Sequence, residues 1–103
     1  MPLDADESLH ESMCWGLAKR LKSSGLYQSV RCHVPYRALG YPSEADIITQ
    51  SKNAIHYYEV KCRYHPNNFR KAMEQFRHFQ ATNQAMDVKY IYITDGMVKR
   101  VRL

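Results

Sequence analysis

Asp46, Glu59 and Lys61 are charged residues in segments that are otherwise rich in β-branched and aromatic residues. Side chains alternate along a strand, so Glu59 and Lys61 would lie on one face of the strand that contains them. Asp46 stands 13 residues before Glu59, near the start of the preceding predicted strand. If these two strands pair, their carboxylates come close together and form a site for a hard cation such as Mg²⁺ or Mn²⁺.

A cation at this position would support hydrolysis of a phosphate ester. The backbone carbonyl of Val60, water molecules and a phosphate oxygen would complete a near-octahedral shell. Lys61 would hold or help to deprotonate the attacking water, whose pKa the cation lowers. The simpler interpretation is an exposed Glu-Lys pair that stabilises a strand by a few tenths of a kcal/mol. Asp46 and the aromatic neighbours of Glu59 favour the cation site.

Hydrophobic periodicity predicts two helices and at least four strands around these residues. The expected elements are a helix over 4–25, strands over 27–34, 44–50 and 54–62, a helix over 67–85, a strand over 87–94 and an additional short strand over 97–103. The segment 35–43 contains two prolines and a glycine, and is therefore expected to be a loop.

The predicted order of elements is α-β-β-β-α-β. Three consecutive strands indicate an antiparallel meander, and the second helix is long enough to cross over to a fourth strand. We therefore expect an α/β fold in which helices flank a mixed central sheet. The 103 residues correspond to one domain, residues 1–103.

Asp46 followed by Glu59-Val60-Lys61, set between two helices, resembles the PD-(D/E)xK nuclease superfamily. This superfamily includes restriction endonucleases, Holliday-junction resolvases and RecB-like exonucleases, and its restriction-endonuclease-like core has the order αβββαβ. The resemblance covers residues 5–95, although Ala45 replaces the proline of the motif.

The resemblance implies a Mg²⁺-dependent DNA nuclease in which Mn²⁺ can substitute. Its class would be a structure-selective endonuclease or exonuclease of DNA repair, recombination or replication. Small members often form homodimers. At this size the chain has no room for a separate DNA-reading domain, so its specificity would come from DNA structure or from a protein partner.

The resemblance also implies further site residues. Many members place a first-helix glutamate near the metal, and Glu11 is the preferred candidate, with Glu7 as the alternative. Gln75 begins a pattern similar to the QxxxY element of RecB-like members, but Phe79 replaces the tyrosine. Gln75 would contact the substrate or orient Lys61.

The net charge of +5 and the pI near 9.2 favour an anionic partner such as nucleic acid. Basic and aromatic side chains near the expected site could contact phosphates or stack on bases. For each of them an exposed helix or loop face is an equally good interpretation. The candidates are Arg37, Arg63, Tyr64, Arg70, Lys71 and Arg77.

Two other functions fit the same pattern. One is a nucleic-acid-binding module without catalytic activity, and the other is an RNA endonuclease. The sequence has no apolar run of the length that a membrane helix requires, and its acidic N-terminus is not a secretory signal. Three widely spaced cysteines indicate reduced thiols in an intracellular protein, whether cytoplasmic, nuclear or viral. The histidines at 10, 33, 56 and 78 show no metal-ligand spacing.

Overall fold

The computed structural model describes residues 5–38, 40–83 and 87–103. Its elements, in chain order, are α1 (Ala5–Ser23), β1 (Ser29–Ala38), β2 (Tyr41–Gln50), β3 (Ile55–Val60), α2 (Pro66–Thr82), β4 (Val88–Thr94) and β5 (Met97–Val101). The predicted αβββαβ order and the additional closing strand are both confirmed. The last residues of the helix expected over 67–85 lie outside the described residues.

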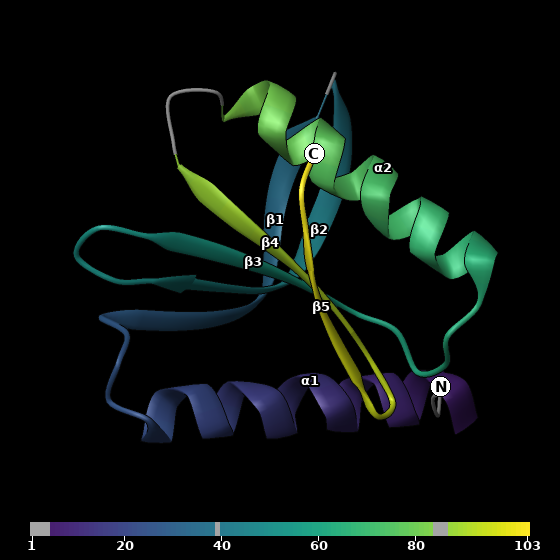
Figure 1. Cartoon of the computed structure of the whole chain (residues 1–103), viewed down its shortest axis with the longest axis horizontal. Coiled ribbons are helices and arrows are strands. Elements are labelled where there is room, and N and C mark those ends of the chain that lie inside the picture. The colour runs from purple at the N-terminus through teal and green to yellow at the C-terminus, as the bar shows by residue number, and fades with distance from the viewer. Residues whose placement is uncertain (1–4, 39, 84–86) are drawn as a thin grey trace.

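The five strands form one mixed sheet in the order β1-β2-β3-β4-β5. β1, β2 and β3 are antiparallel, whereas β3 and β4 are parallel and are connected through α2. Figure 1 shows α1 along one side of the sheet and α2 along the other. Neither helix is long and apolar enough to span a bilayer, among the residues described.

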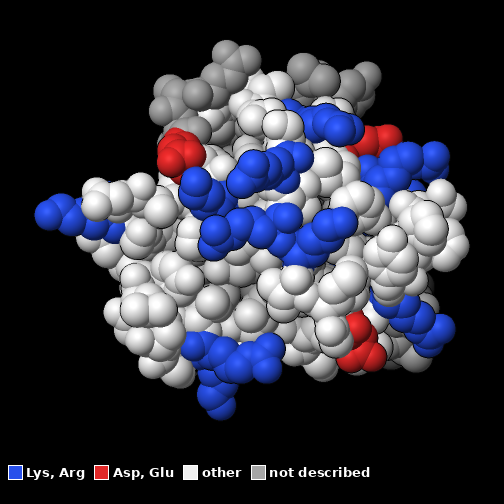
Figure 2. Space-filling view, in the orientation of Figure 1, with Lys and Arg blue, Asp and Glu red and all other residues white. Residues whose placement is uncertain are grey.

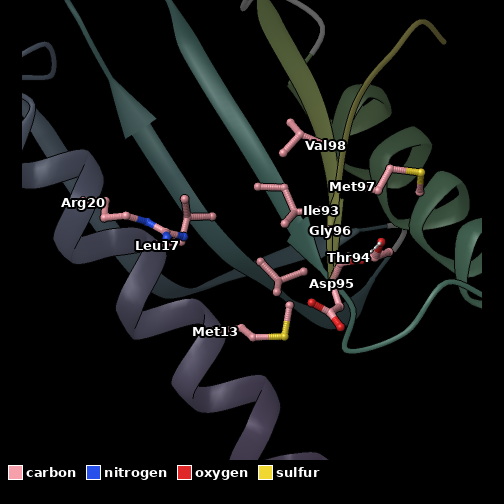
Figure 3. A pocket seen from close by; sticks show the side chains of 10 residues that line it. Met13, Leu17, Arg20, Ile93, Thr94, Asp95, Gly96, Met97 and Val98 are labelled. Carbon is pink, nitrogen blue, oxygen red and sulfur yellow. Dashed lines mark hydrogen bonds between the residues drawn. The ribbon is translucent and has the colours of Figure 1, made fainter.

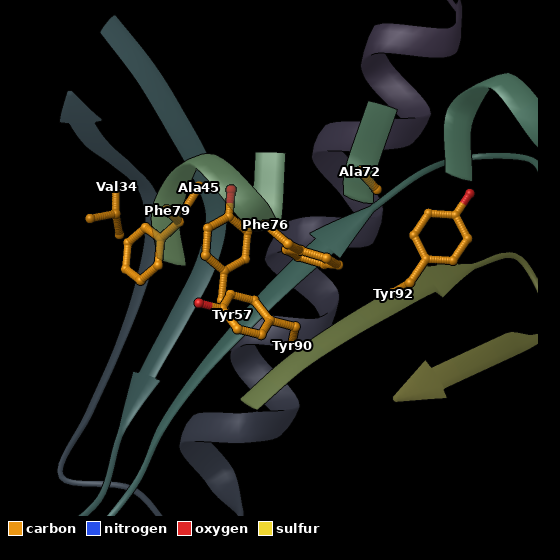
Figure 4. Packing of buried hydrophobic residues seen from close by; sticks show 8 residues of the cluster. All are labelled: Val34, Ala45, Tyr57, Ala72, Phe76, Phe79, Tyr90 and Tyr92. Carbon is orange, nitrogen blue, oxygen red and sulfur yellow. The ribbon is translucent and has the colours of Figure 1, made fainter. Parts of the chain in front are cut away.

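The side of the sheet that faces α2 holds an aromatic core (Figure 4). The Phe76 ring lies 5.1 Å from the rings of both Tyr57 and Tyr90, and is fully buried. Phe79 packs against the same tyrosine, Tyr57, at 5.0 Å. The spacing of Phe76, Phe79 and Ala72 along α2 places all three on the face that meets the sheet, as the helical period predicts.

The other side of the sheet packs against α1. Ala18 is buried against Ile47, Tyr58 and Ile91, which come from three neighbouring strands. Because side chains alternate, Tyr57 and Tyr58 of β3 belong to opposite cores. Both faces of β3 are therefore covered, which explains its aromatic composition.

The segment expected to be a loop, 35–43, is instead the end of a β-hairpin. β1 continues to Ala38 and β2 begins at Tyr41. Prolines are tolerated here because β1 is an edge strand and β3 pairs only with the later part of β2, from Ile47. The loop prediction was wrong because it treated proline as a strand breaker, whereas an edge strand of a sheet can contain proline.

His33 marks a sharp bend in the β1–β2 ribbon. Its φ is 52°, in the left-handed region that non-glycine residues seldom adopt. Before this point Cys32 packs on the α1 side, and after it Val34 packs on the α2 side. β2 changes face at the matching place, because Ala45 and Ile47 also belong to opposite cores. Asp46 stands at this change of face.

Candidate active site

Asp46 lies where β2 and β3 separate. The two strands pair as far as Ile47 and Tyr58. Beyond this pair, the Asp46 carboxylate connects β2 to β3 in place of backbone hydrogen bonds between the strands. Its Oδ2 accepts a hydrogen bond of 2.8 Å from the backbone N–H of Val60 and lies 3.3 Å from His10 Nε2. The side chain is almost completely buried. The expected pairing of the two strands therefore brings Asp46 beside the segment that contains Glu59.

Glu59 is 2% exposed and points toward the α2 side of the sheet, as does Tyr57. The Tyr57 hydroxyl donates a 2.8 Å hydrogen bond to Glu59 Oε1. Burial and the neighbouring charge of Asp46 raise the pKa of Glu59 to about 8, and the Tyr57 hydrogen bond and the charge of Lys61 offset only part of this effect. Two buried carboxylates that repel each other in this way could supply oxygen ligands to a divalent cation, which would offset the repulsion.

The raised pKa of Glu59 gives a testable pH dependence. Between pH 4.5 and about 8 the folded protein keeps a proton that the unfolded chain has released. The free energy of unfolding of the metal-free protein should therefore fall as the pH rises through this range. Urea unfolding at a series of pH values, with EDTA present, would measure the slope, and Glu59→Gln should flatten it.

A matched control for this measurement is Glu74→Gln, which changes an exposed glutamate on α2. This variant should keep the slope of the unmodified protein. If the free energy of unfolding depended on pH equally steeply in the Glu59→Gln protein and the unmodified protein, a group other than Glu59 would hold the proton.

Lys61 follows the last residue of β3 directly, so the strand predicted over 54–62 ends earlier than expected. Its backbone N–H donates to the Ile93 carbonyl at 2.8 Å and fixes the chain against β4. Its charge lowers the pKa of Glu59, which places the ammonium group within electrostatic reach of that carboxylate. Lys61 also lines a cavity of about 230 Å³ together with His10 and Arg63.

Val60 was expected to pack into the core and offer its backbone carbonyl to a cation. Its side chain is fully buried, and its N–H is the donor to Asp46. On the α1 side it borders a groove of about 360 Å³ between α1 and the β4–β5 turn (Figure 3). Met13, Leu17 and Met97 also line this groove, whereas neither Asp46 nor Glu59 does.

The first-helix glutamates have their own surroundings. Glu11 Oε1 lies 3.1 Å from His33 Nε2, and its Oε2 accepts a 3.2 Å hydrogen bond from the Trp15 indole. His33 Nδ1 is 2.9 Å from Glu44 Oε1. Burial disfavours the charged form of His33, but the hydrogen bond to Glu44 and the charge of Glu11 outweigh it and raise the pKa of the imidazole. Glu11 therefore pairs with His33 at the bend, and Glu7 is exposed on α1.

Gln75 is connected to the carboxylates through two tyrosines. The Tyr36 hydroxyl donates a 2.9 Å hydrogen bond to Gln75 Oε1, and the phenol oxygens of Tyr36 and Tyr57 lie 3.3 Å apart. Tyr57 in turn donates to Glu59. Gln75 thus stands at the end of a polar chain that crosses the aromatic core and holds Glu59.

His10 lies near the site, although its spacing from other ligand residues did not predict a metal-binding role. Ligand atoms of His10, Cys14 and Asp46 all lie within 4.8 Å of one another. His10 precedes the buried Cys14 by four residues and the buried Ala18 by eight, so it lies on the face of α1 that meets the sheet. A polar residue on an otherwise apolar helical face was the signal that could have identified it.

All six side chains expected to contact nucleic acid are exposed: Arg37, Arg63, Tyr64, Arg70, Lys71 and Arg77. Arg63 borders the cavity that Lys61 and His10 also line. Arg37 lies in β1 rather than in a loop, and its Nη1 donates to the Gly40 carbonyl at 3.3 Å.

The sheet order and the crossover through α2 define a mixed α/β fold that is restriction-endonuclease-like. Among solved structures, the chain is similar to the small subunit of the heterodimeric restriction endonuclease R.BspD6I, with a TM-score of 0.61 and 13% identity over 91% of this chain and 58% of that subunit. It is also similar to AF1548, described as a protein of unknown function, with a TM-score of 0.61 and 15% identity over 84% of this chain and 46% of the other.

At these identities the similarity shows the fold alone. The chain matches about half the length of these two structures. No family model matches the sequence, and no curated protein matches it either.

Proposed function

We propose that this protein is a Mg²⁺-dependent nuclease that hydrolyses phosphodiester bonds in DNA. The observation that carries the proposal is the pair of buried carboxylates, Asp46 and Glu59, beside Lys61 at the place where β2 and β3 separate. Buried negative charges without a cation are costly, and oxygen ligands of this kind suit Mg²⁺ or Mn²⁺. The fold shared with a restriction endonuclease subunit supports the same class of reaction.

Each residue of the site would have a separate role. Asp46 and Glu59 would hold the cation, together with the backbone carbonyl of Val60. When bound, Mg²⁺ supplies charge stabilisation at the phosphate and lowers the pKa of a coordinated water. Lys61 would orient that water and help to remove its proton. Tyr57, which donates to Glu59, would keep the carboxylate in position.

The exposed basic residues would form the DNA-binding surface. Figure 2 shows Lys and Arg side chains gathered over β5 and α2. Arg70, Lys71 and Arg77 are exposed on α2, and Lys99 of β5 places its Nζ 4.9 Å above the Phe69 ring. Such contacts to phosphates provide affinity without reading the sequence. We infer that specificity depends on DNA structure or on an associated subunit.

The structurally similar restriction endonuclease R.BspD6I is described as heterodimeric, which supports association of this chain with a second subunit. That subunit would be another copy of the chain or a different protein. Two active sites related by symmetry would cut both strands of a duplex.

Replacement of Lys61 by alanine tests the proposal. We expect Lys61→Ala to slow cleavage by about two to four orders of magnitude, because a positioned acid–base group is removed. The assay would use linear duplex, single-stranded, four-way-junction and flap DNA, and RNA, each with Mg²⁺ and with Mn²⁺. Lys52→Ala, at an exposed lysine in the β2–β3 turn, is the matched control and should cleave normally.

The outcomes separate the alternatives. Cleavage at the normal rate by Lys61→Ala would refute the assigned site. Binding of DNA without cleavage under either metal would favour the non-catalytic module, and cleavage of RNA alone would favour the RNA endonuclease.

A further inference from the structure

We propose that His10, Cys14 and Asp46 form a second metal site, suited to a thiolate-binding transition metal such as Zn²⁺, which shares Asp46 with the proposed Mg²⁺ site. Inhibition of the nuclease by this second metal rests on the proposed nuclease function, whereas the metal site itself does not.

The geometry of the three ligands is already close to that of a bound site. His10 Nε2 lies 3.3 Å from Asp46 Oδ2 and 3.7 Å from Cys14 Sγ, and the three ligand atoms lie within 4.8 Å of one another. His10 and Cys14 are four residues apart on α1, which places both side chains on one helical face. Asp46 is held by the Val60 N–H, so one ligand is oriented by a partner outside the site.

The donor set distinguishes this site from the carboxylate pair. Sulfur and imidazole nitrogen favour Zn²⁺ and related transition metals, whereas Mg²⁺ prefers oxygen alone. Three protein ligands leave a fourth position for water. His10 is partly exposed and lines the cavity of about 230 Å³ that also contains Lys61, so a metal ion has a route from solvent.

Cys14 is held in place for such a role by the packing of α1. It is fully buried, and its Sγ lies 3.7 Å from His10 Nε2. A cation bound by the thiolate would replace the thiol proton, so metal binding should release a proton to solution.

Because both metal ions would use Asp46, binding of one should weaken binding of the other. A Zn²⁺ ion held by His10 and Cys14 would bind Asp46 Oδ2, the oxygen that lies 3.3 Å from His10 Nε2, and would compete with Mg²⁺ for this carboxylate. Zn²⁺ would then inhibit the proposed nuclease, and the loss of the thiol ligand would relieve that inhibition.

Titration of the purified protein with Co²⁺ alone, without DNA, tests the site. We expect a thiolate-to-cobalt charge-transfer band and visible bands typical of four-coordinate cobalt. Cys14→Ser should remove the charge-transfer band, and His10→Ala should weaken Co²⁺ binding by about tenfold or more. Cys32→Ser and Cys62→Ser are controls with the same chemical change outside the group of three, and both should keep the band. Far-ultraviolet circular dichroism would confirm that each variant is folded.

The absence of a band in the unmodified protein, or its persistence in Cys14→Ser, would overturn the proposed site. Excess Mg²⁺ should weaken Co²⁺ binding if Asp46 is shared, and an unchanged affinity would overturn the sharing. These measurements need no catalytic activity, so a failure of the proposed nuclease function would be recognised separately in the cleavage assay.

Discussion

Asp46→Asn should abolish Mg²⁺-dependent cleavage while leaving the protein folded. Loss of a metal-binding carboxylate is expected to slow the reaction by about three orders of magnitude, the equivalent of about 4 kcal/mol of transition-state stabilisation. The asparagine side chain keeps an oxygen that can accept the hydrogen bond of the Val60 N–H, so the splayed end of β2 and β3 should remain intact. Cleavage of the preferred DNA substrate and thermal unfolding would be measured in parallel.

Asp87→Asn makes the same chemical change at an exposed position before β4, and it should retain full activity. The Asp46→Asn protein should also be at least as stable as the unmodified protein without metal, because removal of the neighbouring negative charge lowers the pKa of Glu59 toward its ordinary value and reduces the cost of keeping this side chain protonated. Substantial cleavage by Asp46→Asn would exclude Asp46 as a metal ligand.

Phe76→Ala should be the most destabilising single truncation on α2. The ring is fully buried and contacts Tyr57 and Tyr90 at 5.1 Å, so its removal leaves a cavity between helix and sheet. Such a change costs about 3–5 kcal/mol, a large part of the stability of a small domain. Urea unfolding would measure the loss, with the milder Phe76→Leu available if the alanine variant does not fold.

His78→Ala changes an exposed residue on the same helix and should shift the free energy of unfolding by about 0.5 kcal/mol or less. Equal stabilities of the Phe76→Ala and His78→Ala proteins would contradict the packing assigned to α2.

The sequence predicted the parts of the fold that depend on local periodicity. The spacing of Phe76 and Phe79 identified the buried face of α2, and the order of elements identified a mixed sheet with a crossover. The closeness of Asp46 to the Glu59 segment could also be predicted, because a short hairpin fixes which residues of two neighbouring strands approach each other.

The surroundings of the site could not be predicted in the same way. Which residues of α1 approach Asp46 depends on how the helix docks on the sheet, and the structure brings His10 there while Glu11 pairs with His33. The left-handed conformation of His33 could not be predicted, because histidine adopts this region more often than most residues but still only seldom. Pro35 is tolerated because it lies in the edge strand β1, and this position can be recognised only once the strand order is known.

The strand order also has a consequence for the sequence of folding events. β1, β2 and β3 follow one another through short turns, whereas β3 and β4 pair only after the chain has crossed through α2. Contacts that close small loops tend to form before contacts between distant segments. We therefore expect the hairpin with Asp46 and Glu59 to form early, and the backbone hydrogen bond from Lys61 to Ile93 to form late. The barrier to folding would then include the approach of two carboxylates, whose repulsion the charge of Lys61 offsets only in part.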